Sequence, residues 1–217
     1  MRENNVNKLE LHIKAEHLGY WYLRLNGFLS IRNFIVHPDL GDNQETDVDL
    51  LAVRFPYRAE NLIRPMRDSD RFSRFREKSF IALTEVKASV CSLNGPWTRP
   101  ERQNMLRVLS ALGAFPKPEA QIVAESLYKK GMHSSQFYHV SLLCIGGQSN
   151  PDIGRDYPDI PQILWPEVLD FIYNRFREYR SQKASHSQWD EQGHKLWRLS
   201  EASRDEESFK SKVKIVS

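Results

Sequence analysis

Hydrophobic and polar positions along the chain follow strand-like periods in some stretches and helical periods in others. Apolar runs bounded by glycine, proline and polar turns predict four strands, at 28–36, 47–55, 80–88 and 137–145. Helical spacing predicts four helices, at 9–25, 98–112, 118–130 and 166–179. The run FIALTEVKA is apolar almost throughout, which is typical of a central strand buried on both faces. This order of elements indicates a mixed α/β core.

The composition becomes polar and charged beyond Lys183, where Trp189 and Trp197 are isolated apolar positions. We therefore expect one domain over residues 1–182. Residues 183–217 would form a charged C-terminal extension that serves as a docking segment or is partly disordered. The chain has 217 residues, which is long enough for one domain with a sizeable core.

The overall composition excludes several protein classes. No apolar run approaches the roughly 20 residues that span a bilayer, and the N-terminus lacks the pattern of a secretory signal. Cys91 and Cys144 are too few for a disulfide framework and have no metal-ligand spacing, so we expect a reducing cytoplasm. The net charge of +3 and the pI near 8.8 permit a nucleic-acid partner without requiring one.

Charged residues stand at the end of the most apolar predicted strand. Glu85 and Lys87 are two positions apart, so their side chains point to the same face of the sheet. A buried carboxylate or ammonium is costly unless it is paired or binds a metal. For an isolated E-x-K tripeptide, an ion pair at an exposed strand end is the simpler interpretation.

Asp49 changes this balance because it begins the apolar run LLAV of the preceding strand. Acidic groups then stand near apolar stretches on two neighbouring strands. Asp49 and Glu85 together favour a divalent-cation site, since Mg²⁺ prefers carboxylate and carbonyl oxygens. Asp47 lies two residues earlier on the same face, and we interpret it as a solvated residue at the strand entry rather than a ligand.

Glu16 lies within the first predicted helix, on a stripe of apolar residues that includes Ile13 and Tyr20. Either its carboxylate faces a group that stabilises the charge, or the stripe is only partly covered and Glu16 reaches solvent. The opposite stripe is fully apolar and is an alternative buried face: Leu11, Ala15, Leu18, Tyr22 and Leu25. The pattern leaves both interpretations open.

Taken together, these residues resemble the PD-(D/E)XK nuclease superfamily, which has the restriction-endonuclease-like fold. The resemblance rests on the order of three segments: AEHLGYWYLRLNGF with a helix glutamate, TDVDLLAVRF with a strand aspartate, and LTEVKAS with E-x-K. It is nearest to the branch of archaeal Holliday-junction resolvases, in which a helix ending in L-x-x-x-GF precedes the aspartate strand. Val48 stands where the superfamily often has proline, and the segment between Asp49 and Glu85 is long.

The resemblance implies a central mixed sheet of roughly four to five strands flanked by helices. It also implies a nuclease that hydrolyses phosphodiester bonds with Mg²⁺, for which Mn²⁺ would substitute. Lys87 would orient or help deprotonate the attacking water. The metal would bind Asp49, Glu85 and the backbone carbonyl of Val86, with Glu16 as a further candidate. The implied catalytic residues are Glu16, Asp49, Glu85 and Lys87.

Arginine residues concentrate between the second and third predicted strands, where Arg71 and Arg74 are candidates for substrate contact. Arg102 and Gln103 of the next predicted helix are further candidates. We favour a nucleic-acid groove here, because the segment would emerge beside the site. A solvated loop is the alternative, since acidic residues offset part of the charge: Glu60, Asp68, Asp70 and Glu77.

The function expected from these features is a metal-dependent nuclease in bacterial defence or repair, with DNA as the favoured substrate. We expect no membrane partner, and a homodimer or a subunit of a larger complex. A catalytically silent relative that binds nucleic acid or scaffolds a complex is the alternative. No G-x-S-x-G motif occurs and Cys91 has no nearby basic partner, so nothing supports a serine or cysteine nucleophile.

Overall fold

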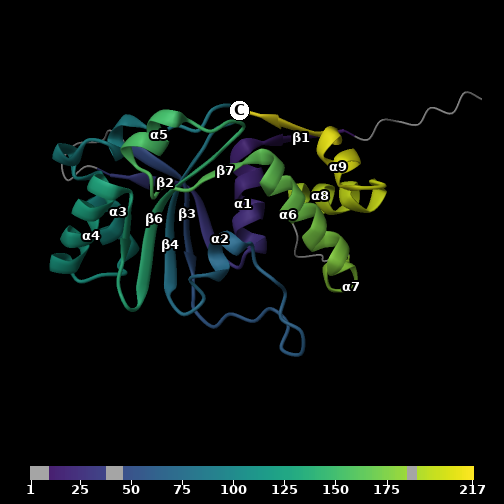
Figure 1. Ribbon diagram of the computed structural model, residues 1–217, viewed down its shortest axis with the longest axis horizontal. Coiled ribbons are helices and arrows are strands. Elements are labelled where there is room, and N and C mark those ends of the chain that lie inside the picture. Colours follow the sequence, from purple (N-terminus) through teal and green to yellow (C-terminus); the bar gives the residue numbers. More distant parts are fainter. Residues whose placement is uncertain (1–9, 38–45, 185–189) are drawn as a thin grey trace, which may run out of the picture.

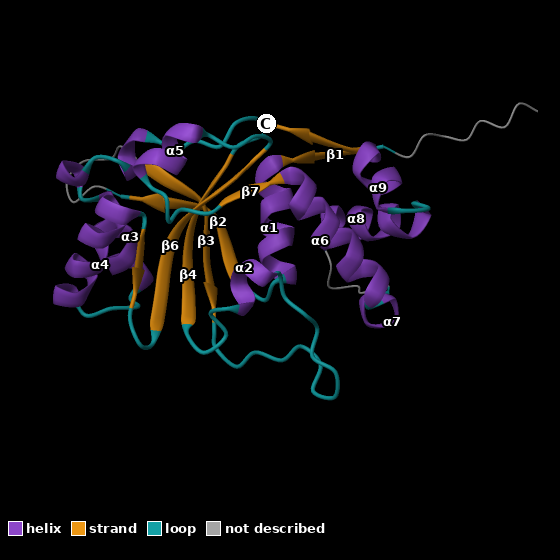
Figure 2. Cartoon of the chain, in the orientation of Figure 1, coloured by secondary structure: helices purple, strands orange, loops and turns teal. Residues whose placement is uncertain are grey.

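The computed structural model describes residues 10–37, 46–184 and 190–217. Within these ranges the main sheet has six strands, and helices cover both of its faces (Figures 1 and 2). The strands of this sheet are β2 (Leu29–Val36), β3 (Thr46–Arg54), β4 (Ser79–Val86), β6 (Tyr138–Gly146), β5 (Met132–Ser134) and β7 (Gln162–Leu164). The α/β class and the mixed sheet are confirmed. The short strands β5 and β7, of three residues each, were not predicted.

The strand order is β2-β3-β4-β6-β5, with β7 also paired to β6. The first three strands form an antiparallel meander, and β6 runs parallel to β4. These four strands confirm the predictions for 28–36, 47–55, 80–88 and 137–145. A parallel neighbour requires a long crossover, which the chain makes through the helices between β4 and β6.

Alternation along β4 sends its side chains into two separate cores. Phe80, Ala82 and Val86 belong to the core beneath α1 (Ala15–Leu25) and α6 (Trp165–Glu178). Ile81 and Leu83 belong to the opposite core, beneath α3 (Asn104–Leu112) and α4 (Lys117–Lys130). This burial on both faces explains why the β4 sequence is apolar almost throughout.

Two predicted helices are confirmed, with small shifts at their ends. The predicted helix at 118–130 is α4, and Gly131 ends it in the left-handed region with φ +73°. The predicted helix at 166–179 is α6, in which Pro166 occupies the first turn. Shorter helices fill connections that the pattern left as loops: α2 (Asp70–Ser73), α5 (Pro151–Asp156) and α7 (Arg180–Lys183).

The predicted helix at 9–25 is wrong in its first turn. Residues Leu11–Lys14 form strand β1, and α1 begins only at Ala15. The partner of β1 is β8 (Val213–Val216), which pairs with it in parallel. The cause is thus a contact between the two ends of the described chain, which a local pattern does not reveal.

The predicted helix at 98–112 also begins later. The Thr98 hydroxyl donates to the carbonyl of Gly95 at the end of the 3₁₀ turn Gly95–Trp97. A second 3₁₀ turn starts at Pro100, and α3 begins at Asn104. A residue before proline is disfavoured in the helical region, and Arg99 is accordingly extended with ψ 91°.

The charged C-terminal segment packs on the domain instead of forming a separate extension. It forms α8 (Glu191–Ala202), α9 (Glu206–Lys212) and β8. Leu196, Phe209 and Val213 are buried in the core that α1 and α6 share. Gly193 of α8 lies so close to Trp21 that a β-carbon there would overlap the indole. Trp189 lies outside the described residues.

Cys91 and Cys144 are free, buried thiols. Among the described residues, no helix is both long and apolar enough to cross a bilayer.

Candidate active site

Asp49 lies where the pairing between β3 and β4 stops. The last register pair of these two strands is Leu50 with Thr84, so Asp49 and Glu85 occupy the next positions, where β3 and β4 no longer pair with each other. The carboxylate Oδ2 of Asp49 accepts the backbone N–H of Val86 at 2.7 Å. A side-chain acceptor therefore takes the place of a backbone acceptor, and the two strands separate at the candidate site.

The neighbouring strand β2 is also distorted at this level. Its pairing with β3 is regular on both sides of Asp49 but omits the position opposite, which is Asn33. Asn33 has φ +51°, a left-handed conformation that asparagine tolerates better than most residues. Both ladders of β3 are thus interrupted at Asp49, as is common where a protein holds strain near a functional group.

Glu85 is more deeply buried than Asp49 and Lys87, with 2% of its side chain exposed. Its Oε2 accepts from Lys87 Nζ at 2.9 Å, and its Oε1 accepts from the indole nitrogen of Trp97 at 2.6 Å. Lys87 Nζ also lies 3.6 Å from Asp49 Oδ2. The structure therefore brings Asp49, Glu85 and Lys87 together, as the sequence predicted, and adds Trp97.

The environment favours a proton on Glu85. Burial, and secondly the negative charge of Asp49, raise the pKa of Glu85 to about 7, against the opposing effects of Lys87 and Trp97. For Lys87 the largest effect is burial, which acts to lower its pKa. The attraction of Glu85 and Asp49 outweighs it, and the pKa of Lys87 lies above its usual value. The pair of carboxylates thus carries repulsion that a cation would relieve.

Glu16 lies in the first turn of α1 and is half-buried. Ala15, Leu18, Tyr22 and Leu25 of the fully apolar stripe are buried, and so are Ile13 and Leu23 of the stripe that carries Glu16. One turn after Glu16, Gly19 approaches Leu50, Val86 and Ile145, which places the start of α1 over the same end of the sheet as Glu85. Within the described residues, no hydrogen bond or ion pair of Glu16 is found.

Arg102 and Gln103 lie beside α3 without contacting the three site residues. Gln103 precedes the helix with φ +56° and lines a cavity of about 390 Å³ with Leu106 and Tyr128. Neither Asp49, Glu85 nor Lys87 lines this cavity. Arg102 is exposed in the 3₁₀ turn that starts at Pro100.

Arg71 and Arg74 lie at the other end of the sheet, so the expectation that their segment emerges beside Glu85 is wrong. Arg71 pairs with Glu167 of α6, at 2.5 and 2.7 Å. Arg74 lies over the ring of Phe75, which packs against Phe80 at the start of β4.

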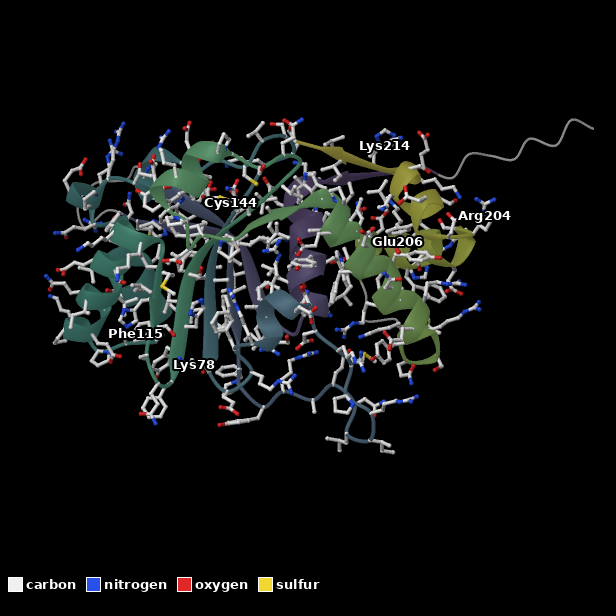
Figure 3. All side chains as sticks on the ribbon, viewed as in Figure 1. Lys78, Phe115, Cys144, Arg204, Glu206 and Lys214 are labelled. Carbon is white, nitrogen blue, oxygen red and sulfur yellow. The ribbon has the colours of Figure 1, made fainter. Side chains whose placement is uncertain are left out.

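Phe80 and Glu85 are five positions apart, or about 16 Å along a strand. Figure 3 shows the same separation: Lys78, just before β4, and Cys144, the register partner of Glu85, lie at opposite ends of the sheet. The connection between β3 and β4 must leave from the end opposite Asp49, because the two strands are antiparallel.

Trp97 is the site residue that sequence reasoning missed. It is buried and lies in the 3₁₀ turn Gly95–Trp97, twelve residues after Glu85. The indole N–H is a donor only, and a buried indole usually finds an acceptor. The sequence signal for Trp97 is a tryptophan that directly follows the turn Asn94-Gly95-Pro96, soon after a strand with an unexplained carboxylate. This arrangement could have predicted a hydrogen bond from the indole to Glu85.

Within the described residues, no three histidine, cysteine, aspartate or glutamate side chains gather as a metal-binding group. A cation at this site would therefore depend on the two carboxylates of Asp49 and Glu85, with a backbone carbonyl and water completing its shell.

In comparisons with known proteins, no family model, no curated protein and no solved structure matches the chain.

Proposed function

We propose that the chain is a metal-dependent nuclease, with Asp49, Glu85 and Lys87 as its catalytic centre. The observation that carries the proposal is the meeting of these three side chains at the separated ends of β3 and β4. Two carboxylates and one ammonium group, gathered where β3 and β4 no longer pair with each other, are more than a strand-end ion pair requires. The mixed sheet flanked by helices also agrees with the restriction-endonuclease-like core that the proposal assigns to the chain.

The residues fit a hard divalent cation such as Mg²⁺. Asp49 and Glu85 would hold it together with the carbonyl of Val86, and the pKa of Glu85, raised to about 7 by burial and by Asp49, reflects repulsion that the cation would relieve. Glu16, at the same end of the sheet, is the candidate for a further ligand or for holding a water molecule. When bound, the cation would supply Lewis-acid stabilisation of the phosphate and an acidified water.

Lys87 supplies a positive charge at the centre. Its ammonium group lies between the two carboxylates, and a quarter of its side chain is exposed. An ammonium group held in this way can donate to a water or to a phosphate oxygen as negative charge develops there. The phosphodiester of a DNA strand is the substrate that we favour.

The test is cleavage of DNA and RNA with Mg²⁺ or Mn²⁺ by the wild type, Lys87→Ala and Lys130→Ala. Lys130 is an exposed lysine at the end of α4 and serves as the matched control. Lys87→Ala should lose about 100-fold or more in rate, in the range attributed to a positioned proton-transfer or charge-stabilising group. Equal cleavage by the wild type and Lys87→Ala would contradict the proposal.

A catalytically silent, nucleic-acid-binding relative is the second candidate. It is favoured by one observation: both carboxylate oxygens of Glu85 already accept hydrogen bonds, from Trp97 and Lys87, and the group is almost fully buried. The same assay separates the two candidates. Binding of DNA without cleavage at any divalent-cation concentration would support the silent protein and contradict the nuclease.

A further inference from the structure

A second cluster of charge lies at the end of the sheet opposite Glu85. Residues 55–69, which follow β3, form a long loop at this end of the sheet (Figure 1). Part of this loop lines a hollow of about 590 Å³ that we call the basic cavity. Its charged lining residues are Arg54, Arg58, Arg67, Arg76, Asp68 and Asp70. Four arginines thus face two aspartates. The site residues Asp49, Glu85 and Lys87 do not line this cavity.

The ion pairs behind the basic cavity leave positive charge in excess. Asp68 accepts from Arg54 at 2.5 Å and from Arg58 at 2.6 Å, and Arg175 lies 3.4 Å away. Glu60 pairs with Arg58, Arg175 and Lys183. Four cationic side chains therefore share two carboxylates in this network.

Most of this positive charge is removed from water. The side chains of Arg54 and Arg175 are 4% and 1% exposed. Burial, as the largest effect, lowers the pKa of both Arg175 and Lys183 against the pull of their carboxylate partners. Buried charges are costly unless they are fully paired, so a network with two surplus cations is incompletely neutralised.

Arg54 also has a donor that is not used. Its Nε donates to the carbonyl of Asn26 and its Nη2 to Asp68. Its Nη1 is buried and has no partner among the described residues. An unsatisfied buried donor of a charged group costs more than a typical hydrogen bond contributes. Arg54 lines the basic cavity, so an anion bound there would place the missing negative charge beside this incompletely satisfied guanidinium group.

We propose that the basic cavity is a binding site for a phosphate group, separate from the Asp49–Glu85–Lys87 centre. Arginine suits this role because its fixed fork of donors matches phosphate oxygens. The group belongs either to a free phosphate or nucleotide, or to the backbone of a nucleic-acid strand. The exposed ring of Tyr57 on the cavity wall offers a stacking face to a nucleotide base in either case. This inference does not depend on the nuclease proposal.

The test measures phosphate binding to the full chain in EDTA, by ³¹P line broadening and by the thermal midpoint at constant ionic strength. The probes are inorganic phosphate, thymidine monophosphate and a single-stranded oligothymidylate. Phosphate should raise the midpoint above its value in chloride, because a ligand of the folded state stabilises it. Absence of both line broadening and a midpoint shift with all three probes would overturn the proposal.

The decisive variant is Arg67→Gln combined with Arg76→Gln, since both side chains are exposed on the cavity lining. The matched control is Arg99→Gln combined with Arg198→Gln, which removes two exposed arginines elsewhere. The first pair should weaken phosphate binding about tenfold or more, and the control should not. Arg76→Gln alone provides a milder variant that should fall between the wild type and the double substitution.

The remaining outcomes identify the source of the phosphate group and the site that binds it. Tight binding of the oligothymidylate that the double substitution abolishes assigns the site to a strand backbone, and preference for the small probes assigns it to a free anion. Phosphate binding that survives the double substitution but is lost in Lys87→Ala would overturn the proposal, because the ion would then occupy the other centre.

Discussion

The indole nitrogen of Trp97 donates a hydrogen bond of 2.6 Å to Glu85 Oε1, the carboxylate oxygen that Lys87 does not contact. Trp97 is fully buried beneath α3, so this bond fixes the carboxylate from the core side. The carboxylate is thus held between a neutral donor within the protein and a cationic donor toward the surface. The orientation of the Glu85 carboxylate is therefore fixed by contacts within the protein, without a ligand.

Replacing Trp97 by phenylalanine should remove this bond while keeping an aromatic ring. A hydrogen bond to a charged group contributes about 1.5–3 kcal/mol, so Trp97→Phe should lose stability in that range above pH 8, where Glu85 is ionised. Urea unfolding measures the loss. Trp165→Phe is the control, because the Trp165 indole donates to the neutral carbonyl of Ala88. Its cost should be about 1 kcal/mol, and equal costs in both variants would contradict a charged acceptor.

Two substitutions of Asp49 separate its structural and its proposed metal-binding roles. Asp49→Ala leaves the Val86 N–H without its acceptor, which should cost about 1–3 kcal/mol in urea unfolding. Asp49→Asn keeps an oxygen in place and should cost less, but it removes the charge that a cation needs. Mn²⁺ binding followed by electron paramagnetic resonance should therefore be lost in both variants. Retention of Mn²⁺ by Asp49→Asn would contradict the metal site.

The main strands were predictable because their pattern is local. The apolar runs of β3, β4 and β6 are enough to predict that these segments are buried. Strand β1 was not predictable, since Leu11 pairs with Val213 at the far end of the chain. The C-terminal segment was misjudged for the same reason: Phe209 is one of few apolar positions there, and only its packing against Tyr173 of α6 reveals its place in the core.

The candidate site was predictable in part. Asp49, Glu85 and Lys87 are marked by charge beside apolar runs, and their convergence follows from the pairing of adjacent strands. Trp97 was missed because it acts from a turn without regular periodicity. The position of Arg71 was predicted wrongly, although the order of the residues allowed the correct prediction. Asp49 lies near the start of β3 and Glu85 near the end of β4, so the connection that joins these antiparallel strands lies at the opposite end of the sheet.

The C-terminal helices should stabilise the whole domain. Phe209 is fully buried, and Phe209→Ala should lower the free energy of unfolding by about 3–5 kcal/mol through lost burial and a cavity. Phe137→Ala is the matched control, because that ring is 65% exposed, and its effect should stay within about 0.5 kcal/mol. Denaturant unfolding gives both values. A change near zero for Phe209→Ala would mean that the segment behaves as a separable extension.

His139 should make the protein sensitive to acid. Its ring stacks on Phe75 at 3.9 Å, and its buried Nδ1 has no partner among the described residues. Burial, followed by the charges of Arg74 and Lys78, lowers the pKa of His139 from 6.5 to about 4. Between these values the unfolded chain binds more protons than the folded protein, so the stability present above pH 6.5 is lost as the pH falls toward 4.

The size of this effect follows from the shift, which corresponds to roughly 3 kcal/mol for so buried a ring. His139→Phe preserves the stacking and removes the titrating group. Between pH 7 and pH 4 its free energy of unfolding should therefore fall by about 3 kcal/mol less than that of the wild type. His12→Phe, which replaces an exposed histidine of β1, should retain the acid sensitivity of the wild type. Urea unfolding across this range gives the comparison. Parallel pH profiles for the wild type and His139→Phe would show that the acid sensitivity arises elsewhere.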